Sequence, residues 1–131
     1  MNRLFLLLSL FILASGCRKS IGPEKLYGTW KYIKVESPQN PQESLTEVEV
    51  ARENPSISFN PDKKLTIMWG GRELSKGEYR LEGKLIRYKE DLGNGKFREF
   101  PFLISRLSAS ELVFETMEQE PVRITARKET E

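Results

Sequence analysis

The chain of 131 residues contains no histidine, one cysteine and only two aspartates. Without histidine it lacks the commonest general base and the usual nitrogen ligand of zinc. Both aspartates, Asp62 and Asp91, lie in turn segments, where a carboxylate usually accepts hydrogen bonds from the local backbone. Glutamates such as Glu78 and Glu99 occupy positions expected to face solvent, and no pair shares an inward position. We therefore expect no enzymatic activity, no metal site and no cofactor.

An excess of positive charge is also missing. Lysine and arginine number 21 against 19 aspartates and glutamates. Nucleic-acid-binding proteins usually concentrate a basic excess on one face, and no basic cluster here exceeds two or three residues. Nucleic acid is therefore excluded as an expected partner.

The longest apolar run lies at the N-terminus. Residues 1–3 supply a short positive segment, and the run of Leu4 to Ala14 follows it. A helix of that length rises only ~16 Å, about half the hydrocarbon core of a bilayer. The run is thus too short for a permanent span and has the length and flanks of a signal peptide. We predict that residues 1–16 are a signal peptide.

The sole cysteine directly follows small residues at the end of this signal. Leu13-Ala14-Ser15-Gly16-Cys17 resembles the lipobox of bacterial lipoproteins, in which the cysteine is acylated and becomes the new N-terminus. The alternative is an ordinary secretory signal with an unrelated cysteine near its end. Lipid on Cys17 would hold the protein on a membrane without a spanning segment. The polar residues 17–25 then predict a flexible tether.

The residue after the cysteine bears on localisation. Arg18 stands where some lipoproteins retained at inner membranes have an aspartate, and the acidic run that resembles surface-export signals of Bacteroidota is missing. We therefore expect a lipid-anchored protein of the cell envelope, on the periplasmic face of the outer membrane.

Beyond the tether, apolar and polar residues alternate with a period of two, which is typical of strands with one buried face. A first long segment covers residues 28–36. Seven further segments are residues 56–60, 64–69, 77–82, 84–90, 96–107, 111–118 and 122–129. Short turn signals such as Gly70-Gly71 separate most of them, which favours antiparallel neighbours. Residues 26–131 therefore predict an all-β domain, an eight-stranded antiparallel up-and-down barrel.

One connection is longer than a hairpin needs. It covers residues 38–55 and contains Ser44 and Glu47 at capping-box spacing, which favours a short helix from Leu45 to Arg52. Alternation of Val48 with its glutamate neighbours would also suit a strand. Connections of this length serve either as a functional lid or as a solvated surface loop.

The order of the motifs resembles the lipocalin-like lipoproteins of Bacteroidota, within the wider calycin group. Gly28-Thr29-Trp30 is similar to the G-x-W motif at the start of the first strand. Three later segments also match that family: residues 57–62 (ISFNPD), 77–79 (GEY) and 107–112 (LSASEL). Together they cover residues 26–128, and they imply a barrel of the lipocalin type.

The resemblance also implies how the barrel is closed at one end. In the family the tryptophan, here Trp30, closes that end, and an arginine near the last strand packs across its ring. The best-matched arginine is Arg127, and such a contact is worth ~0.5–2 kcal/mol. Strand parity places Arg127 opposite Ile124 and Ala126, so an inward position would require a bulge.

An eight-stranded barrel is at the size where side chains either fill the interior or leave room for one small ligand. The expected inward residues include eight aromatic side chains: Tyr32, Phe59, Trp69, Tyr79, Tyr88, Phe100, Phe102 and Phe114. They predict a site for a small apolar ligand, with tyrosine hydroxyls orienting it. Alternatively these rings fill the barrel, and the protein is a monomeric module that docks onto or inhibits an envelope protein. An internal void of several hundred Å³ would favour the first function.

Overall fold

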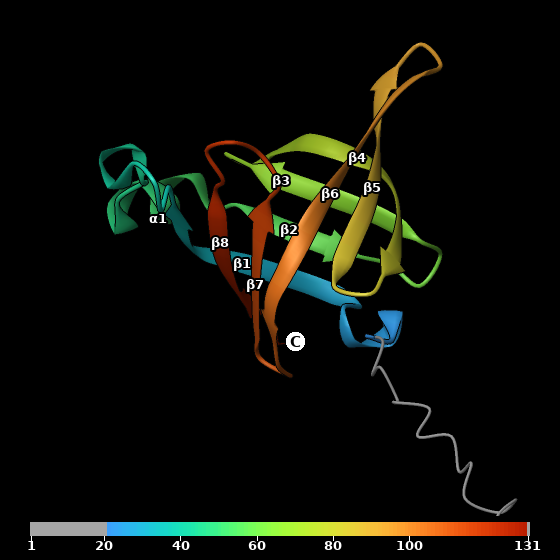
Figure 1. Ribbon diagram of the computed structural model, residues 1–131, viewed down its shortest axis with the longest axis horizontal. Coiled ribbons are helices and arrows are strands. Elements are labelled where there is room, and N and C mark those ends of the chain that lie inside the picture. The colour runs from blue at the N-terminus through green and yellow to red at the C-terminus, as the bar shows by residue number, and fades with distance from the viewer. Residues whose placement is uncertain (1–20, 131) are drawn as a thin grey trace, which may run out of the picture.

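The computed structural model describes residues 21–130 and shows a closed eight-stranded antiparallel barrel (Figure 1). Each strand pairs with the next, and the first pairs with the last, so the predicted up-and-down architecture is confirmed. The strands are β1 (Gly28–Glu36), β2 (Ser56–Phe59), β3 (Lys64–Trp69), β4 (Arg72–Glu82), β5 (Leu85–Gly93), β6 (Lys96–Leu107), β7 (Glu111–Thr116) and β8 (Arg123–Lys128). Closure leaves no unpaired sheet edge.

The period-two pattern of the sequence sets the inner and outer faces of these strands. In β2, Ile57 and Phe59 are fully buried, while Ser58 between them is only partly buried.

Two-residue turns join several of the neighbouring strands. Gly70 and Gly71 have φ of 62° and 78°, and Asn94 and Gly95 have φ of 54° and 72°, as tight hairpin turns require. The pattern had indicated a fourth strand only from residue 77, whereas β4 begins at Arg72.

The long connection after β1 contains a short 3-10 helix, Pro41–Glu43, and the helix α1, Glu47–Glu53. The expected helix is therefore confirmed, but its cap differs. Thr46, not Ser44, accepts the hydrogen bond from the backbone of Glu49, at 3.2 Å. The Ser44 hydroxyl instead accepts a bond from the Ser37 amide at 2.8 Å, so it fixes the connection upstream of the helix.

The predicted tether is partly structured. Pro23–Lys25 form a 3-10 helix, η1, which positions Leu26 in the core with no exposed surface. The Leu26 carbonyl accepts a 2.8 Å hydrogen bond from the indole nitrogen of Trp30, which is itself fully buried. Trp30 therefore packs against the segment that follows η1, at this end of the barrel. Cys17 and the signal peptide lie outside the described residues.

The cation that covers Trp30 is Lys128, and the expectation of Arg127 was wrong. The Lys128 ammonium lies 4.6 Å from the centre of the indole ring and donates a hydrogen bond to the Tyr27 carbonyl. Arg127 is exposed and lies in register with Lys31 and Glu111 on the outer face. The register shift lies in β1, between Tyr32 and Lys34, so β8 keeps its parity and its inward residues remain even-numbered.

This correction leads to a prediction. Lys128→Ala removes both the contact with the ring and the bond to the Tyr27 carbonyl, and we expect it to lower the free energy of unfolding by about 1–2 kcal/mol. Burial lowers the pKa of Lys128. Because the partly buried ammonium also costs desolvation free energy, which alanine does not, we expect the loss of stability to be modest. Arg127→Ala should change stability by less than about 0.5 kcal/mol. Urea unfolding of both variants measures this, and the opposite order would contradict the assignment.

The topology gives the barrel two different ends. We call the end with η1 and the connections after β2, β4 and β6 the base. The other end, the rim, has the connections after β1, β3, β5 and β7. Figure 1 shows η1 and the β6–β7 turn on the lower side of the molecule, with α1 and the β5–β6 hairpin on the upper side. Because the chain enters at η1 and leaves after β8, both described chain ends lie at the base.

Candidate functional site

The inward aromatic residues contact one another across the barrel. Of the eight predicted, only Trp69 and Phe100 are partly exposed, and Tyr32, Phe59, Tyr79, Tyr88, Phe102 and Phe114 are buried. A continuous series of edge-on ring contacts runs from Trp69 through Tyr32, Phe114 and Phe102 to Phe100. Its centroid distances are 6.5, 6.0, 5.4 and 5.3 Å. Rings at these distances are in direct packing contact. The interior is therefore occupied by side chains along this path.

Two hollows on the surface of the described residues lie outside this aromatic interior. One of about 610 Å³ lies on the outer face of β3, β4 and β5, lined by residues such as Thr66, Lys76 and Phe97. The other, of about 570 Å³, lies at the base beside η1. None of the eight aromatic residues lines either hollow.

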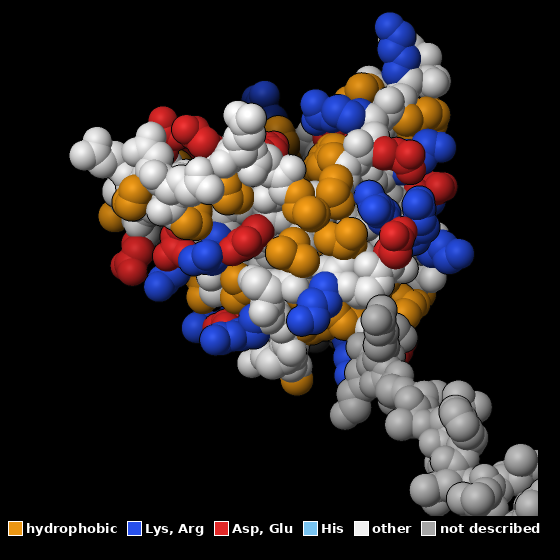
Figure 2. All heavy atoms as spheres, viewed as in Figure 1, with side chains coloured by type: hydrophobic (Ala, Val, Ile, Leu, Met, Phe, Trp, Pro, Cys, Tyr) orange, Lys and Arg blue, Asp and Glu red, His pale blue; other side chains and the backbone are white. Residues whose placement is uncertain are grey.

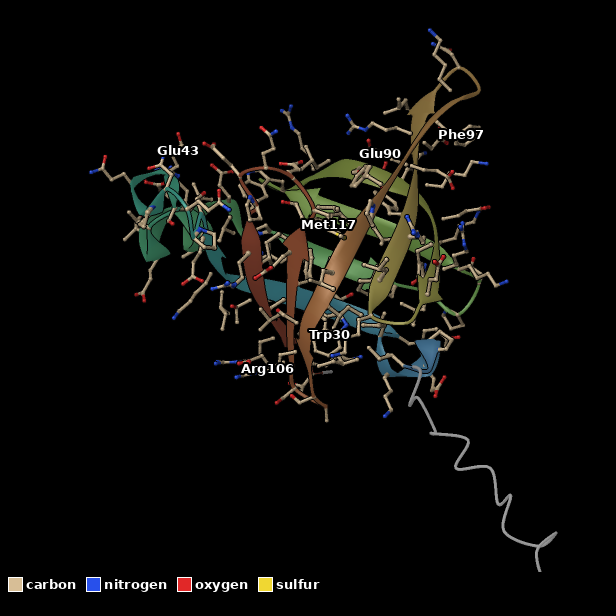
Figure 3. All side chains as sticks on the ribbon, in the orientation of Figure 1. Trp30, Glu43, Glu90, Phe97, Arg106 and Met117 are labelled. Carbon is tan, nitrogen blue, oxygen red and sulfur yellow. The ribbon has the colours of Figure 1, made fainter. Side chains whose placement is uncertain are left out.

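A polar network lies between the aromatic interior and the rim. The carboxylate of Glu90, which is 9% exposed, accepts hydrogen bonds from the Ser75 hydroxyl and from Arg98, the latter at 2.6 Å. The Ser75 and Tyr88 hydroxyls are 2.5 Å apart. The guanidinium of Arg98 also lies 5.2 Å from the centre of the Phe100 ring. Figure 3 shows Glu90 where the β5–β6 hairpin leaves the barrel.

This environment fixes the protonation of the neighbouring phenols. Burial raises the pKa of Tyr88 to about 12, and the negative charge of Glu90 contributes in the same direction. Burial also raises the pKa of Tyr32, with a smaller contribution from the nearby Tyr88. Both hydroxyls therefore stay protonated well above physiological pH. The Glu90 carboxylate is paired with the Arg98 guanidinium at 2.6 Å, so the network orients side chains from three strands.

The sequence analysis missed Ser75, Glu90 and Arg98. A signal for Glu90 was present, because it shares the even parity of Ile86 and Tyr88 on the same strand. The sequence analysis assigned no role to Glu90. No group of three or more His, Cys, Asp or Glu residues that could hold a metal ion occurs within residues 21–130.

The rim itself displays exposed apolar side chains. Among residues 21–130, five large hydrophobic residues are more than half exposed: Val48, Leu74, Leu92, Phe97 and Met117. They belong to α1, the start of β4, the β5–β6 hairpin and the β7–β8 connection, all toward the rim of the barrel. Figures 2 and 3 show the β5–β6 hairpin projecting from the molecule, and Figure 3 labels Phe97 on it.

The base contains none of these exposed residues but contains the predicted closing residues. Gly28, where β1 begins, has φ of 116°, a conformation that side chains disfavour, and it faces the Lys128 side chain. Trp30 and Arg106 lie on this side of the molecule in Figure 3.

Comparisons with known proteins add no family assignment. No protein-family model matches the chain, and a search of the curated proteins found no significant match. Within the described part of the chain, none of the helices combines the length and apolar content needed to cross a membrane.

Proposed function

We propose that this protein is a lipid-anchored interaction module of the cell envelope, which docks a protein partner with the rim of its barrel. The observation that supports this most directly is the distribution of exposed apolar side chains. All five strongly exposed large hydrophobic residues of the described chain lie at one end of the barrel. Isolated exposed apolar residues are ordinary, whereas their restriction to the segments near the rim supports an interaction surface at that end.

The packing of the interior favours this function over carriage of a small apolar ligand. Carriage would require a void of several hundred Å³ inside the barrel. The ring contacts from Trp69 to Phe100 occupy that path, and the hollows of about 570 and 610 Å³ lie outside the aromatic interior. We therefore prefer the docking function to the ligand site that the aromatic residues had suggested.

The polar network contributes to docking by holding the hairpin. Leu92 and Phe97 lie on the β5–β6 hairpin beyond the last inward aromatic residues, where the strands project past the barrel. Glu90 on β5 is joined to Arg98 on β6, and Ser75 joins it to β4. These bonds fix the direction in which the hairpin leaves the barrel. A rigid apolar projection loses less entropy on binding than a mobile one.

The lipid anchor and the rim are at opposite ends. The chain enters the barrel at η1, so an acylated Cys17 places the base toward the membrane and the rim away from it. The proposed partner therefore presents an apolar surface at a distance of about one barrel length from the membrane that holds the chain.

Site-specific photo-crosslinking in the cells that produce the protein tests this function. We expect a photoreactive residue at Phe97 or Met117 to crosslink to one protein, and the same residue at Ala109 of the base not to do so. Leu92→Ser in the Phe97-labelled chain should reduce the yield several-fold, because hydrophobic anchors dominate interface energies. Lys96→Ser, on the tip of the same hairpin, is the matched control and should have little effect.

A second measurement tests the alternative function, carriage of a small apolar ligand. Organic extracts of the purified protein should contain no reproducible small molecule at a stoichiometric amount. Such a molecule, together with equal crosslinking from rim and base, would contradict the docking function and favour ligand carriage.

A further inference from the structure

The hollow at the base combines an apolar floor with three cations. Its volume is about 570 Å³, and its apolar side chains include Ile21, Ile104 and Leu107. Ile104 is 3% exposed, and the other two pack against the core, so this floor is a fixed part of the barrel. The hollow lies where η1, the β4–β5 turn and the β6–β7 turn meet.

The cations are Lys25, Lys84 and Arg106, and no acidic residue lines the hollow. Each comes from a different element, so the fold brings them together. Arg106 is paired with Glu111 at 3.5 Å, but its side chain is 72% exposed, and such a surface pair is weak. Lys84 is held through its backbone, because its carbonyl accepts a 2.8 Å hydrogen bond from the Ile104 amide. Its exposed side chain is therefore available to an anionic group.

The position of the hollow relative to the anchor indicates what approaches it. Ile21 lines the hollow and is four residues after Cys17. Four residues span at most about 14 Å. Lipid on Cys17 would therefore hold this end of the barrel against the headgroup layer of the membrane.

We propose that the hollow binds the headgroup of an anionic phospholipid in the anchoring membrane, with the phosphate at the three cations and the first acyl methylenes on the apolar floor. This inference rests on the lipid anchor of the proposed function. It adds a second contact with the membrane, which would hold the barrel upright and direct the rim toward its partner. A basic group near an anionic membrane surface strengthens attachment about fivefold per charge.

The test uses the full chain purified from membranes and reconstituted into vesicles. Ala109→Cys introduces an exposed position in the hollow for an environment-sensitive fluorophore. We expect the emission to shift to shorter wavelength, and acrylamide quenching to decrease several-fold, when phosphatidylglycerol replaces part of the phosphatidylcholine. Raising the salt concentration to about 0.5 M should reverse both changes, because it screens charges beyond a few ångströms.

Two variants separate the site from general charge. Lys84→Gln with Arg106→Gln should abolish the difference between the two kinds of vesicle. Lys96→Gln with Lys89→Gln, at the hairpin, removes the same charge and should leave the difference intact. Identical signals in both vesicles, or equal effects of both pairs, would overturn the inference.

A separate measurement tests whether Cys17 is a lipid anchor. Mass spectrometry of the N-terminal peptide reports whether Cys17 is acylated, and an unmodified Cys17 would also take up the fluorophore. If it is unmodified, the anchor proposal fails, and vesicle flotation then tests the hollow alone. Flotation with phosphatidylglycerol vesicles that drops about fivefold for each removed base cation would support the site, and its absence would overturn it.

Discussion

Replacing Trp30 by alanine should lower the free energy of unfolding by about 3–5 kcal/mol. The side chain is fully buried beneath η1, and its indole nitrogen donates a 2.8 Å hydrogen bond to the Leu26 carbonyl. Alanine leaves a cavity at the base, leaves that carbonyl without its donor and removes the ring beneath Lys128. Most of the loss comes from the cavity, because pairing of β1 with β2 and β8 prevents this strand from moving to fill it.

Urea unfolding followed by far-ultraviolet circular dichroism measures this loss. Trp30→Phe is the informative companion, because it keeps most of the buried surface but cannot donate to Leu26. We expect it to cost about 1–2 kcal/mol. A loss below about 1 kcal/mol for Trp30→Ala would show that the base is not closed by this residue.

The alternation of the sequence was sufficient to predict the barrel because each strand has one buried face. Residues such as Ile57 and Phe59 mark that face directly, and the short turns leave antiparallel pairing as the simple solution. The number of strands followed from these local signals. The helix after β1 was also predicted. Its N-cap is Thr46 and not Ser44, because two hydroxyl residues close together in the sequence compete for that role.

What the sequence could not predict depends on three-dimensional packing. Arg127 and Lys128 are adjacent in β8 and therefore point to opposite faces of the sheet. Which of them faces Trp30 depends on the position of the register shift between β1 and β8. The burial of Glu90 depends on Arg98 and Ser75 from two other strands, and its own strand segment does not indicate these partners. Whether eight aromatic rings fill a barrel or line a void depends on strand tilt, which no local pattern encodes.

The two ends of the molecule differ for a topological reason. In an up-and-down barrel, odd-numbered connections gather at one end and even-numbered connections at the other. Here the odd ones hold the exposed apolar residues Val48, Phe97 and Met117, and the even ones meet η1 beside Lys84 and Arg106. One end therefore displays exposed apolar side chains, and the other brings cations from separate elements together. The sequence places these two sets of residues in alternating order along the chain.

Gly77 is a position where the polar network around Glu90 is sensitive to the addition of a single methyl group. It lies in β4, in register with Leu65 on one side and Glu90 on the other. A Cβ atom at this position would lie 2.0 Å from the Lys89 carbonyl oxygen and 3.0 Å from the Glu90 Cα. These are backbone atoms of the neighbouring strand, so no side-chain rotation relieves the clash, and β4 and β5 must separate.

We expect Gly77→Ala to lower the free energy of unfolding by about 3 kcal/mol, at the upper end for overpacked sites. Separation of the strands should also move Ser75 away from Glu90 and release the hairpin, so the crosslinking yield from Phe97 should fall with stability. Gly83→Ala is the matched control, because its φ of 60° is disfavoured for alanine but nothing lies within 4 Å of the added atom. That variant should cost only about 1 kcal/mol. Equal losses in chemical unfolding would mean that backbone conformation, and not the approach of β5, requires glycine at residue 77.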